Sequence, residues 1–150
     1  MTPFDAVRAQ LDSGVPFAKH AGVTLMMLED GHAIAELPQT DASINHIQTQ
    51  HAGAMFTLGE AASGAALAGA FLPVLMSVRP VAAGARIAYE RIARGTITAE
   101  ARTSEPGEAL RAKLEADGKA VFDVDVTLRD EADRTVATMT VAWHVSPLRK

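Results

Sequence analysis

The chain has 150 residues, of which 48% are hydrophobic, and it contains no cysteine. This composition fits one folded domain with its own core, and it excludes disulfides, thiol nucleophiles and cysteine metal sites. Asp and Glu number 18 against 14 Lys and Arg, and no basic patch is interleaved with aromatic residues, so we expect no nucleic-acid partner. The N-terminal stretch is polar and amphipathic and lacks the apolar segment of a secretory signal, so we expect a cytoplasmic protein.

The first third of the chain predicts a short helix, a hairpin and a loop. Residues 3–12 carry apolar side chains at helical spacing. Residues 23–29 and 32–37 predict two strands, and the Asp-Gly pair between them predicts a tight hairpin turn. Residues 39–50 are polar and rich in turn formers. They predict a loop that is long for a connection, and such loops often carry function.

The rest of the chain predicts a long helix followed by strands of antiparallel type. Residues 51–71 consist mainly of Ala, Gly and large apolar residues, and Pro73 closes the helix that they predict. A shorter helix is expected over residues 108–117, and the C-terminal SPLRK segment is expected to be loose. The expected strands cover residues 85–91, 96–102, 121–129 and 135–145.

This order predicts an α+β fold in which an antiparallel sheet, apolar on one face, wraps around one long central helix. Residues 52–76 are apolar enough to raise a transmembrane interpretation. Glu60 near the centre, the weakly hydrophobic alanines and Pro73 argue against it. A helix enclosed by a sheet is apolar all round for the same physical reason. We therefore expect residues 1–150 to form a single domain with no membrane partner.

Residues 51–71 contain a single residue of the types Lys, Arg, Asp and Glu, which is Glu60. A carboxylate within an apolar helix is unfavourable unless something pairs with it or uses it. On a helix it shares one face with three smaller residues, which are Gly53, Thr57 and Gly64. This face forms a channel that lets a ligand or another backbone come close. Alternatively, Glu60 reaches solvent or the channel packs against a partner helix.

The start of the same helix suits a carbonyl oxygen that gains negative charge. Ala52, Gly53 and Ala54 have small side chains, so their free amides and the positive end of the helix dipole are approachable. Ala52 and Glu60 are separated by about 12 Å of helix, which is more than twice the reach of a glutamate side chain. A carbonyl held at the amides of one helix would therefore meet Glu60 of another copy. This predicts an obligate homodimer with two shared sites.

Asn45 is followed by the His-Ala-Gly of residues 51–53, and Glu60 stands nine residues after the histidine. In this pattern the sequence resembles the hotdog-fold acyl-CoA thioesterases of the PaaI-like branch. The usual pattern there is N-x5-H-G-G, followed by Asp or Glu nine residues after the histidine. Thr49 also fits, and the order of strands and helices agrees over nearly the whole chain. The resemblance implies a hotdog fold and hydrolysis of an acyl-CoA to free acid and CoA. Coenzyme A would be part of the substrate, with no separate cofactor. Family members assemble as homodimers, often paired into tetramers, with sites across the dimer interface.

The resemblance also implies roles for individual residues. Glu60 would be the general base that activates water, or the nucleophile that attacks the thioester carbonyl. The backbone amide of Ala52, with that of Gly53 nearby, would hold the thioester oxygen. Asn45 and His51 would position that oxygen or the water and would order the loop. Further candidates for contact with the substrate are Thr49, Thr57 and Gly64.

Simpler structural roles are available for several of these residues. Asn45 is suited to a turn or a helix entry, His51 to a helix cap, and Thr57 to a hydrogen bond back to the helix carbonyls. Tyr89 and Trp143 are expected to be packing residues. The five histidines lack the spacing of metal ligands, so no metal site is expected. The arginines between 79 and 102 belong either to solvated strand faces or to the contact with an anionic cofactor.

Two other functions stay open at this point. A non-catalytic acyl-CoA-binding protein is one, because the chain has Ala52 at the first glycine of the family pattern and Ala82 where some relatives have Ser or Thr. Gln48 is a third departure, at a position that is often Gly in the family. A hydratase or dehydratase acting on acyl chains is the other, with His51 and Glu60 as its histidine and acid. The acyl group itself is not indicated by the sequence.

Overall fold

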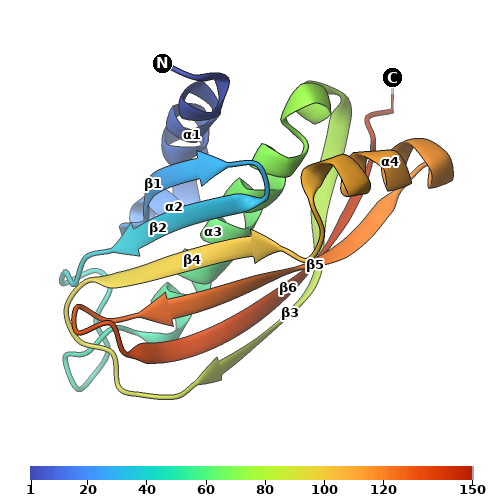
Figure 1. Ribbon diagram of the computed structural model, residues 1–150. Coiled ribbons are helices and arrows are strands. Elements are labelled where there is room, and N and C mark those ends of the chain that lie inside the picture. Colours follow the sequence, from blue (N-terminus) through green and yellow to red (C-terminus); the bar gives the residue numbers. More distant parts are fainter. Residues whose placement is uncertain (150) are drawn as a thin grey trace.

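Six strands build one antiparallel sheet (Figure 1). In the computed structural model, which describes residues 1–149, the strands lie side by side in the order β1-β2-β4-β5-β6-β3. The sheet and the helices make the predicted α+β architecture. The strands span β1 Thr24–Glu29, β2 His32–Leu37, β3 Val78–Tyr89, β4 Ile97–Thr103, β5 Ala120–Arg129 and β6 Thr135–Pro147.

The helices divide into one central helix and several that lie toward its ends. The central helix α3 packs against the sheet, α1 lies beside β1, and α2 lies against α3 (Figure 1). A 3-10 helix, η1, follows α3 directly and leads into β3. The bounds are α1 Pro3–Gly14, α2 Pro16–Ala21, α3 Ala52–Ala70, η1 Leu72–Ser77 and α4 Gly107–Asp117.

The apolar face of the sheet and the sheet-facing side of α3 form the core. Two glycines let this contact become close, because a Cβ at Gly59 would press on the Met139 sulfur and a Cβ at Gly69 would collide with the Glu29 carbonyl oxygen. The inward alternation expected for the last two strands is confirmed, since Val124 and Val141 are fully buried. Among residues 1–149, no helix combines the length and the apolar character that crossing a membrane requires.

The helix α1 protects the β1 edge of the sheet. The Asp12 carboxylate accepts a 2.8 Å hydrogen bond from the Leu25 amide, and the Arg8 guanidinium donates one of 3.1 Å to the Leu25 carbonyl. These bonds satisfy backbone groups that an edge strand would otherwise leave open. The opposite edge is different, because β3 pairs with β6 on one side only and most of its residues are exposed.

Three features differ from the sequence-based expectations. The strand expected at 85–91 is β3, which begins at Val78 and ends at Tyr89. Most of its residues are exposed, so its sequence lacks the alternation of buried and exposed positions that would have indicated its true start. The helix α2 was not expected, although Pro16 at its first position and Gly22 just beyond its end are ordinary helix signals. The strand β6 extends to Pro147, so the SPLRK segment is only partly loose. The last residue of that segment, Lys150, lies outside the described residues.

Candidate active site

His51 caps the N-terminus of α3 through its side chain. Its Nδ1 accepts a 2.8 Å hydrogen bond from the Gly53 amide, which the sequence had suggested as a holder of the thioester oxygen. The Met55 amide bonds the His51 carbonyl oxygen. Within residues 1–149, the amides of Ala52 and Ala54 donate no hydrogen bond. The donors that this helix end offers to an anionic oxygen are therefore those of Ala52 and Ala54.

Asn45 holds the loop before the helix in shape. Its Oδ1 accepts hydrogen bonds from the amides of Ile47 and Thr49, at 3.1 and 3.0 Å. Its Nδ2 donates a 2.8 Å bond to the Thr49 hydroxyl. Gln48 in the same turn has a φ of +61°, a backbone conformation that favours glycine. Asn45 thus makes the local bonds of a turn residue, and Thr49 is buried as its partner.

A pocket of about 390 Å³ lies at this helix terminus, and Asn45, Thr49 and Ala52 line it. Tyr89, at the end of β3, also lines the pocket, and its hydroxyl donates a 2.8 Å hydrogen bond to the Ala52 carbonyl oxygen. Partial burial raises the pKa of the Tyr89 phenol, so the hydroxyl keeps its proton throughout the neutral range. Arg91 lines the same pocket two residues further along.

Gln50 supplies a buried polar group in the wall of this pocket. Its Nε2 donates hydrogen bonds to the carbonyl oxygens of Leu37 and Gly95, at 3.0 and 2.9 Å. Its Oε1 is buried and accepts no hydrogen bond from residues 1–149. A buried acceptor without a partner is unusual in a folded protein.

Glu60 lies in the middle of α3, half-buried and at the wall of a different cavity. Burial raises the pKa of its carboxyl above the ordinary value. Within residues 1–149, its carboxylate makes neither a hydrogen bond nor an ion pair. The cavity has a volume of about 370 Å³, and Gly64 and Trp143 line it together with Glu60. A carboxylate that is desolvated and unpaired beside a cavity is a candidate general base.

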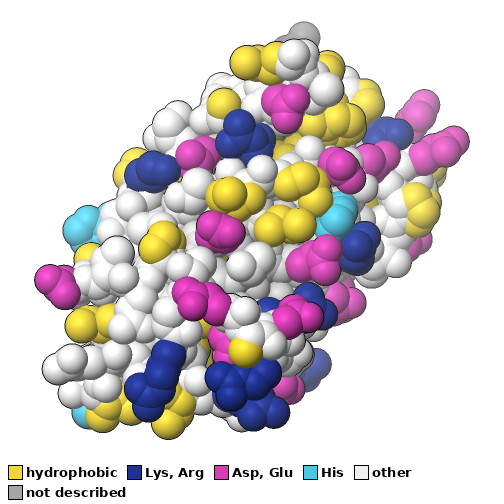
Figure 2. All heavy atoms as spheres, turned by 60° about the vertical axis from the view of Figure 1, so that its left-hand side comes forward, with side chains coloured by type: hydrophobic (Ala, Val, Ile, Leu, Met, Phe, Trp, Pro, Cys, Tyr) yellow, Lys and Arg dark blue, Asp and Glu magenta, His cyan; other side chains and the backbone are white. Residues whose placement is uncertain are grey.

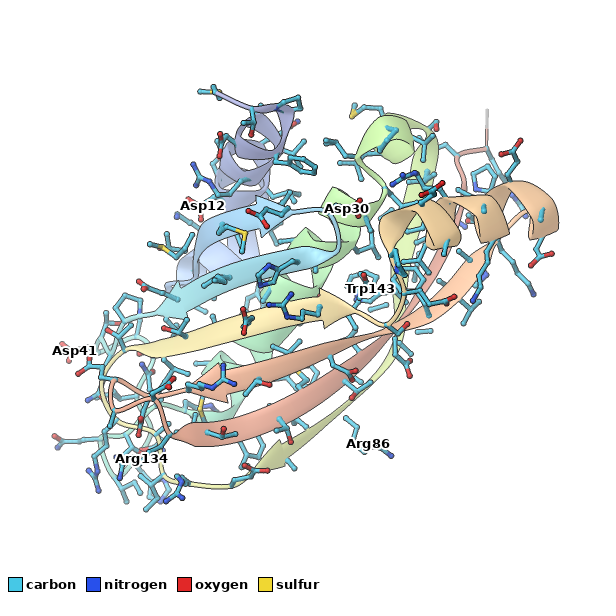
Figure 3. The ribbon with its side chains drawn as sticks, in the orientation of Figure 1. Asp12, Asp30, Asp41, Arg86, Arg134 and Trp143 are labelled. Atoms are coloured by element: carbon cyan, nitrogen blue, oxygen red, sulfur yellow. The ribbon has the colours of Figure 1, made fainter. Side chains whose placement is uncertain are left out.

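The position of Trp143 is fixed by a short chain of hydrogen bonds. Its Nε1 donates a 3.1 Å bond to the Ser63 hydroxyl, which itself donates a 2.7 Å bond to the Glu60 carbonyl oxygen. The ring also packs against Gly64, where an added Cβ would be 3.7 Å from it. Figure 3 shows Trp143 on the sheet, on the side of α3. Trp143 is therefore held by the turn of α3 that carries Glu60.

Within one chain the predicted residues fall into two groups. Asn45, Thr49 and Ala52 line the pocket at the start of α3, whereas Glu60 and Gly64 line the cavity further along the helix. The remaining predicted residues line neither space. The Thr57 hydroxyl donates a 2.9 Å hydrogen bond back to the Gly53 carbonyl oxygen, and His51 and Gly53 form the cap.

Three residues of these walls were not expected to have a role beyond packing or loop structure, namely Gln50, Tyr89 and Trp143. The alternation of the last strand places Trp143 inward, but no pattern distinguishes a wall of a cavity from a filled core. Tyr89 and Gln50 meet the helix start only after the chain has folded. Among the described residues, no three His, Asp or Glu side chains gather as metal ligands.

Solved structures with the same fold cover nearly the whole chain. PA5026 from Pseudomonas aeruginosa, a protein of unknown function described as a probable thioesterase, is 26% identical with a TM-score of 0.84, over 98% of this chain and 97% of that one. A candidate thioesterase from Shewanella oneidensis is 18% identical with a TM-score of 0.82, over 97% and 98%. The thioesterase HI1161 from Haemophilus influenzae is 16% identical with a TM-score of 0.77, over 100% and 94%.

These likenesses confirm the hotdog fold and the resemblance to hotdog thioesterases that the sequence indicated. No curated protein matches the chain. The sequence profile of one family matches residues 5–145, which is most of the chain. The protein therefore belongs to the DUF4442 family, described as a domain of unknown function.

Proposed function

We propose that the protein is an acyl-CoA thioesterase that uses Glu60 as a general base and works as a homodimer. The observation that carries this proposal is the environment of Glu60, a half-buried and unpaired carboxylate at the wall of an apolar cavity. The free amides of Ala52 and Ala54, on the same helix, supply the second catalytic element. The thioesterase descriptions of structurally similar proteins agree with this chemistry.

In the proposed reaction, the Glu60 carboxylate takes a proton from a water molecule while the water oxygen forms a bond to the thioester carbonyl carbon. The carbonyl oxygen becomes an anion and accepts hydrogen bonds from the amides of Ala52 and Ala54. When the tetrahedral intermediate collapses, the carbon–sulfur bond breaks. The proton on Glu60 then passes to the departing CoA sulfur. The raised pKa of Glu60 suits both halves of this proton transfer at neutral pH.

The homodimer follows from the length of α3 and from the free edge of β3. Ala52 and Glu60 are about 12 Å apart along one helix, so the same substrate carbonyl meets both only if they come from different copies. The strand β3 is 12 residues long, pairs only with β6, and leaves Val81 and Tyr89 exposed. An exposed edge of this length is a template for pairing with a second copy about a two-fold axis.

The phosphates of CoA need a cationic contact, and Arg91 is our candidate. It lines the pocket at the start of α3, and within residues 1–149 it has no ion-pair partner. Arg102, in contrast, lies on the outer side of β4 and contacts the Glu100 carboxylate at 3.3 Å. Figure 2 shows Lys and Arg side chains on the lower part of one face, with Asp and Glu side chains directly above them.

The test is thiol release from a panel of acyl-CoAs by the wild type, Glu60→Gln and Glu108→Gln. The chain has no cysteine, so a thiol reagent detects only the CoA released. We expect hydrolysis by the wild type, a loss of about 100-fold or more in Glu60→Gln, and no change in Glu108→Gln on α4. Equal rates in Glu60→Gln and the wild type would refute the role of Glu60. Tight binding of CoA esters without thiol release would favour a non-catalytic binding protein.

A single turnover in ¹⁸O-labelled water tests whether Glu60 acts as a nucleophile and passes one of its own oxygens to the product acid. A general base delivers the water oxygen to the acyl carbon, so the product acid carries the label. A nucleophile first forms an anhydride with the acyl group, and water then attacks one of its two carbonyl carbons. Attack at the carboxyl carbon of Glu60 releases the acyl group together with an oxygen of Glu60. The first product acid would in that case carry an unlabelled oxygen from the protein. We expect the label in the product.

A further inference from the structure

The cavity beside Glu60 is enclosed mainly by aliphatic side chains from elements at the N-terminus of the chain and from the second half of α3. Its volume of about 370 Å³ lies within the range of small-molecule sites. The helices α1 and α2 close one side of it, and η1 closes another. Representative lining residues are Val7, Leu11, Ala18, Leu67, Ala68 and Leu75.

The polar groups in the wall are few, and the charged ones differ in what they contact. Asp12 accepts a hydrogen bond from the Leu25 amide at 2.8 Å and pairs with Lys19 at 3.3 Å, so its charge is used to attach α1 and α2 to the sheet. Figure 3 shows Asp12 between α1 and β1. Glu60 is therefore the one carboxylate of this wall without a partner among residues 1–149. Such a cavity suits a ligand with one polar end and an apolar remainder.

The dimensions of the cavity indicate the size of that apolar part. The lining residues on α3 extend from Glu60 to Ala68, which is about 12 Å of helix. An extended alkyl chain advances about 1.3 Å per carbon–carbon bond, so about nine bonds cover this length. By volume, a cavity of about 150 Å³ holds the six carbons of benzene, so this one, roughly 2.5 times as large, has room for about 15 carbons. The length of the cavity is the tighter limit, and it indicates an acyl group of medium length.

We propose that this cavity binds the unbranched acyl chain of the substrate, about eight to twelve carbons long, with the thioester carbonyl at Glu60. The helices α1 and α2 form the wall that limits the chain length. The assignment of the carbonyl end rests on the proposed thioesterase function. Binding of the chain itself rests only on the cavity and its lining.

Trp143 provides a direct measure of occupancy. It is the only tryptophan of the protein, it lines the cavity, and it is 8% exposed. Decanoic acid entering the cavity should change its fluorescence emission in a saturable manner, whereas butanoic acid should not. This measurement requires no catalytic turnover. Titrations are made with free fatty acids of four to sixteen carbons, together with phenylacetic acid as a test of a compact aromatic group.

Two variants should move the chain-length preference in opposite directions. Ala68→Leu adds three carbon atoms to the wall, so we expect decanoic acid to bind at least tenfold more weakly and the preferred acid to become shorter. Leu11→Ala removes three carbon atoms from the opposite wall, so we expect the preferred acid to become longer. Leu114→Ala is the matched control, because Leu114 is a partly buried leucine on α4 outside this cavity. It should leave the preference unchanged.

The outcomes separate this proposal from the proposed function. Saturable binding of medium-chain acids that the two variants shift, without thiol release from any acyl-CoA, would support the cavity and refute the thioesterase. Thiol release with no fluorescence response at any chain length, and the same acyl preference in all variants, would support the thioesterase and overturn the cavity. Stronger binding of phenylacetic acid than of decanoic acid would also overturn it. Thermal denaturation of each variant establishes that it is folded.

Discussion

The Tyr89 hydroxyl donates a hydrogen bond to the carbonyl oxygen of Ala52, so the last residue of β3 is tied to the first residue of α3. The edge strand thereby helps to hold the helix terminus that carries the free amides. In Tyr89→Phe we expect the protein to lose about 1 kcal/mol of stability, the usual contribution of one hydrogen bond. We expect kcat to fall several-fold with little change in KM. Unchanged kcat in this variant would show that the bond does not position the amides.

The sharing of each site between two copies can be tested by mixing two inactive variants. Ala52→Pro removes the amide that we assign to the oxyanion. It should preserve α3, because proline is favoured at the first helical position and His51 before it is already extended, with φ −68° and ψ 139°. Glu60→Gln removes the base. Each homodimer should be inactive, but every mixed dimer contains one intact site.

An equal mixture of the two variants, unfolded and refolded together, should regain about a quarter of the wild-type activity, because half of the dimers are mixed and each has one working site of two. The controls are each variant refolded alone. Activity no higher in the mixture than in the controls would contradict a shared site, as would sedimentation of the active wild type as a monomer.

Activity and stability should respond to pH in opposite directions. Burial raises the pKa of Glu60 in the folded protein above its ordinary value of 4.5. Between the pKa of Glu60 in the unfolded protein and its higher pKa in the folded protein, the folded state binds more protons than the unfolded state. The contribution of Glu60 to the free energy of unfolding therefore falls as the pH rises through this interval and is constant above it. A general base must lose its proton, so kcat should rise over the same interval.

The measurement is the difference in melting temperature between the wild type and Glu60→Gln from pH 4 to pH 8. The wild type should lose stability relative to the variant as the pH rises. Hydrogen bonds from His32 and from the Arg134 amide lower the pKa values of the Glu100 and Asp130 carboxyls, respectively. Both carboxyls are present in the two proteins, so their contributions cancel in the difference. A difference that is independent of pH would mean that Glu60 titrates normally.

Gln48 offers a stabilising substitution in the loop before α3. Its φ of +61° is unfavourable for a residue with a side chain, and glycine adopts it freely. In Gln48→Gly we expect a gain of up to about 1 kcal/mol in the free energy of unfolding. Chemical denaturation of the two proteins checks this. The same substitution at Gln10, within α1, should destabilise instead.

Much of the fold could be predicted because its elements carry local signals. The hairpin of β1 and β2 follows from alternation around Asp30-Gly31, and the last two strands alternate over ten or more residues. The sequence predicts too late a start for β3, because an alternating pattern reflects the burial of one face and not the backbone conformation. A strand at an exposed edge has little buried face, and its beginning is determined by its pairing with β6.

The candidate site was predictable only in part, and for a related reason. Glu60 is conspicuous because a charge in an apolar helix is rare, and the helix start is visible from its small residues. The use of the Gly53 amide by the His51 ring depends on one side-chain conformation, which no spacing shows. The contact of Tyr89 with Ala52 joins residues 37 positions apart, so it arises only from tertiary structure.

The two sides of α3 should also diverge at different rates in evolution. The sheet-facing side contains Gly59 and Gly69, where even a methyl group would strike Met139 or the backbone of β1. At Gly69 the obstacle is backbone, so a substitution would push β1 away from the helix, whereas at Gly59 the Met139 side chain would have to move aside. The other side faces a cavity whose walls can gain or lose carbon atoms independently. One helix therefore combines a constrained side with an adaptable one, which lets a lineage change the shape of this cavity without rebuilding its fold.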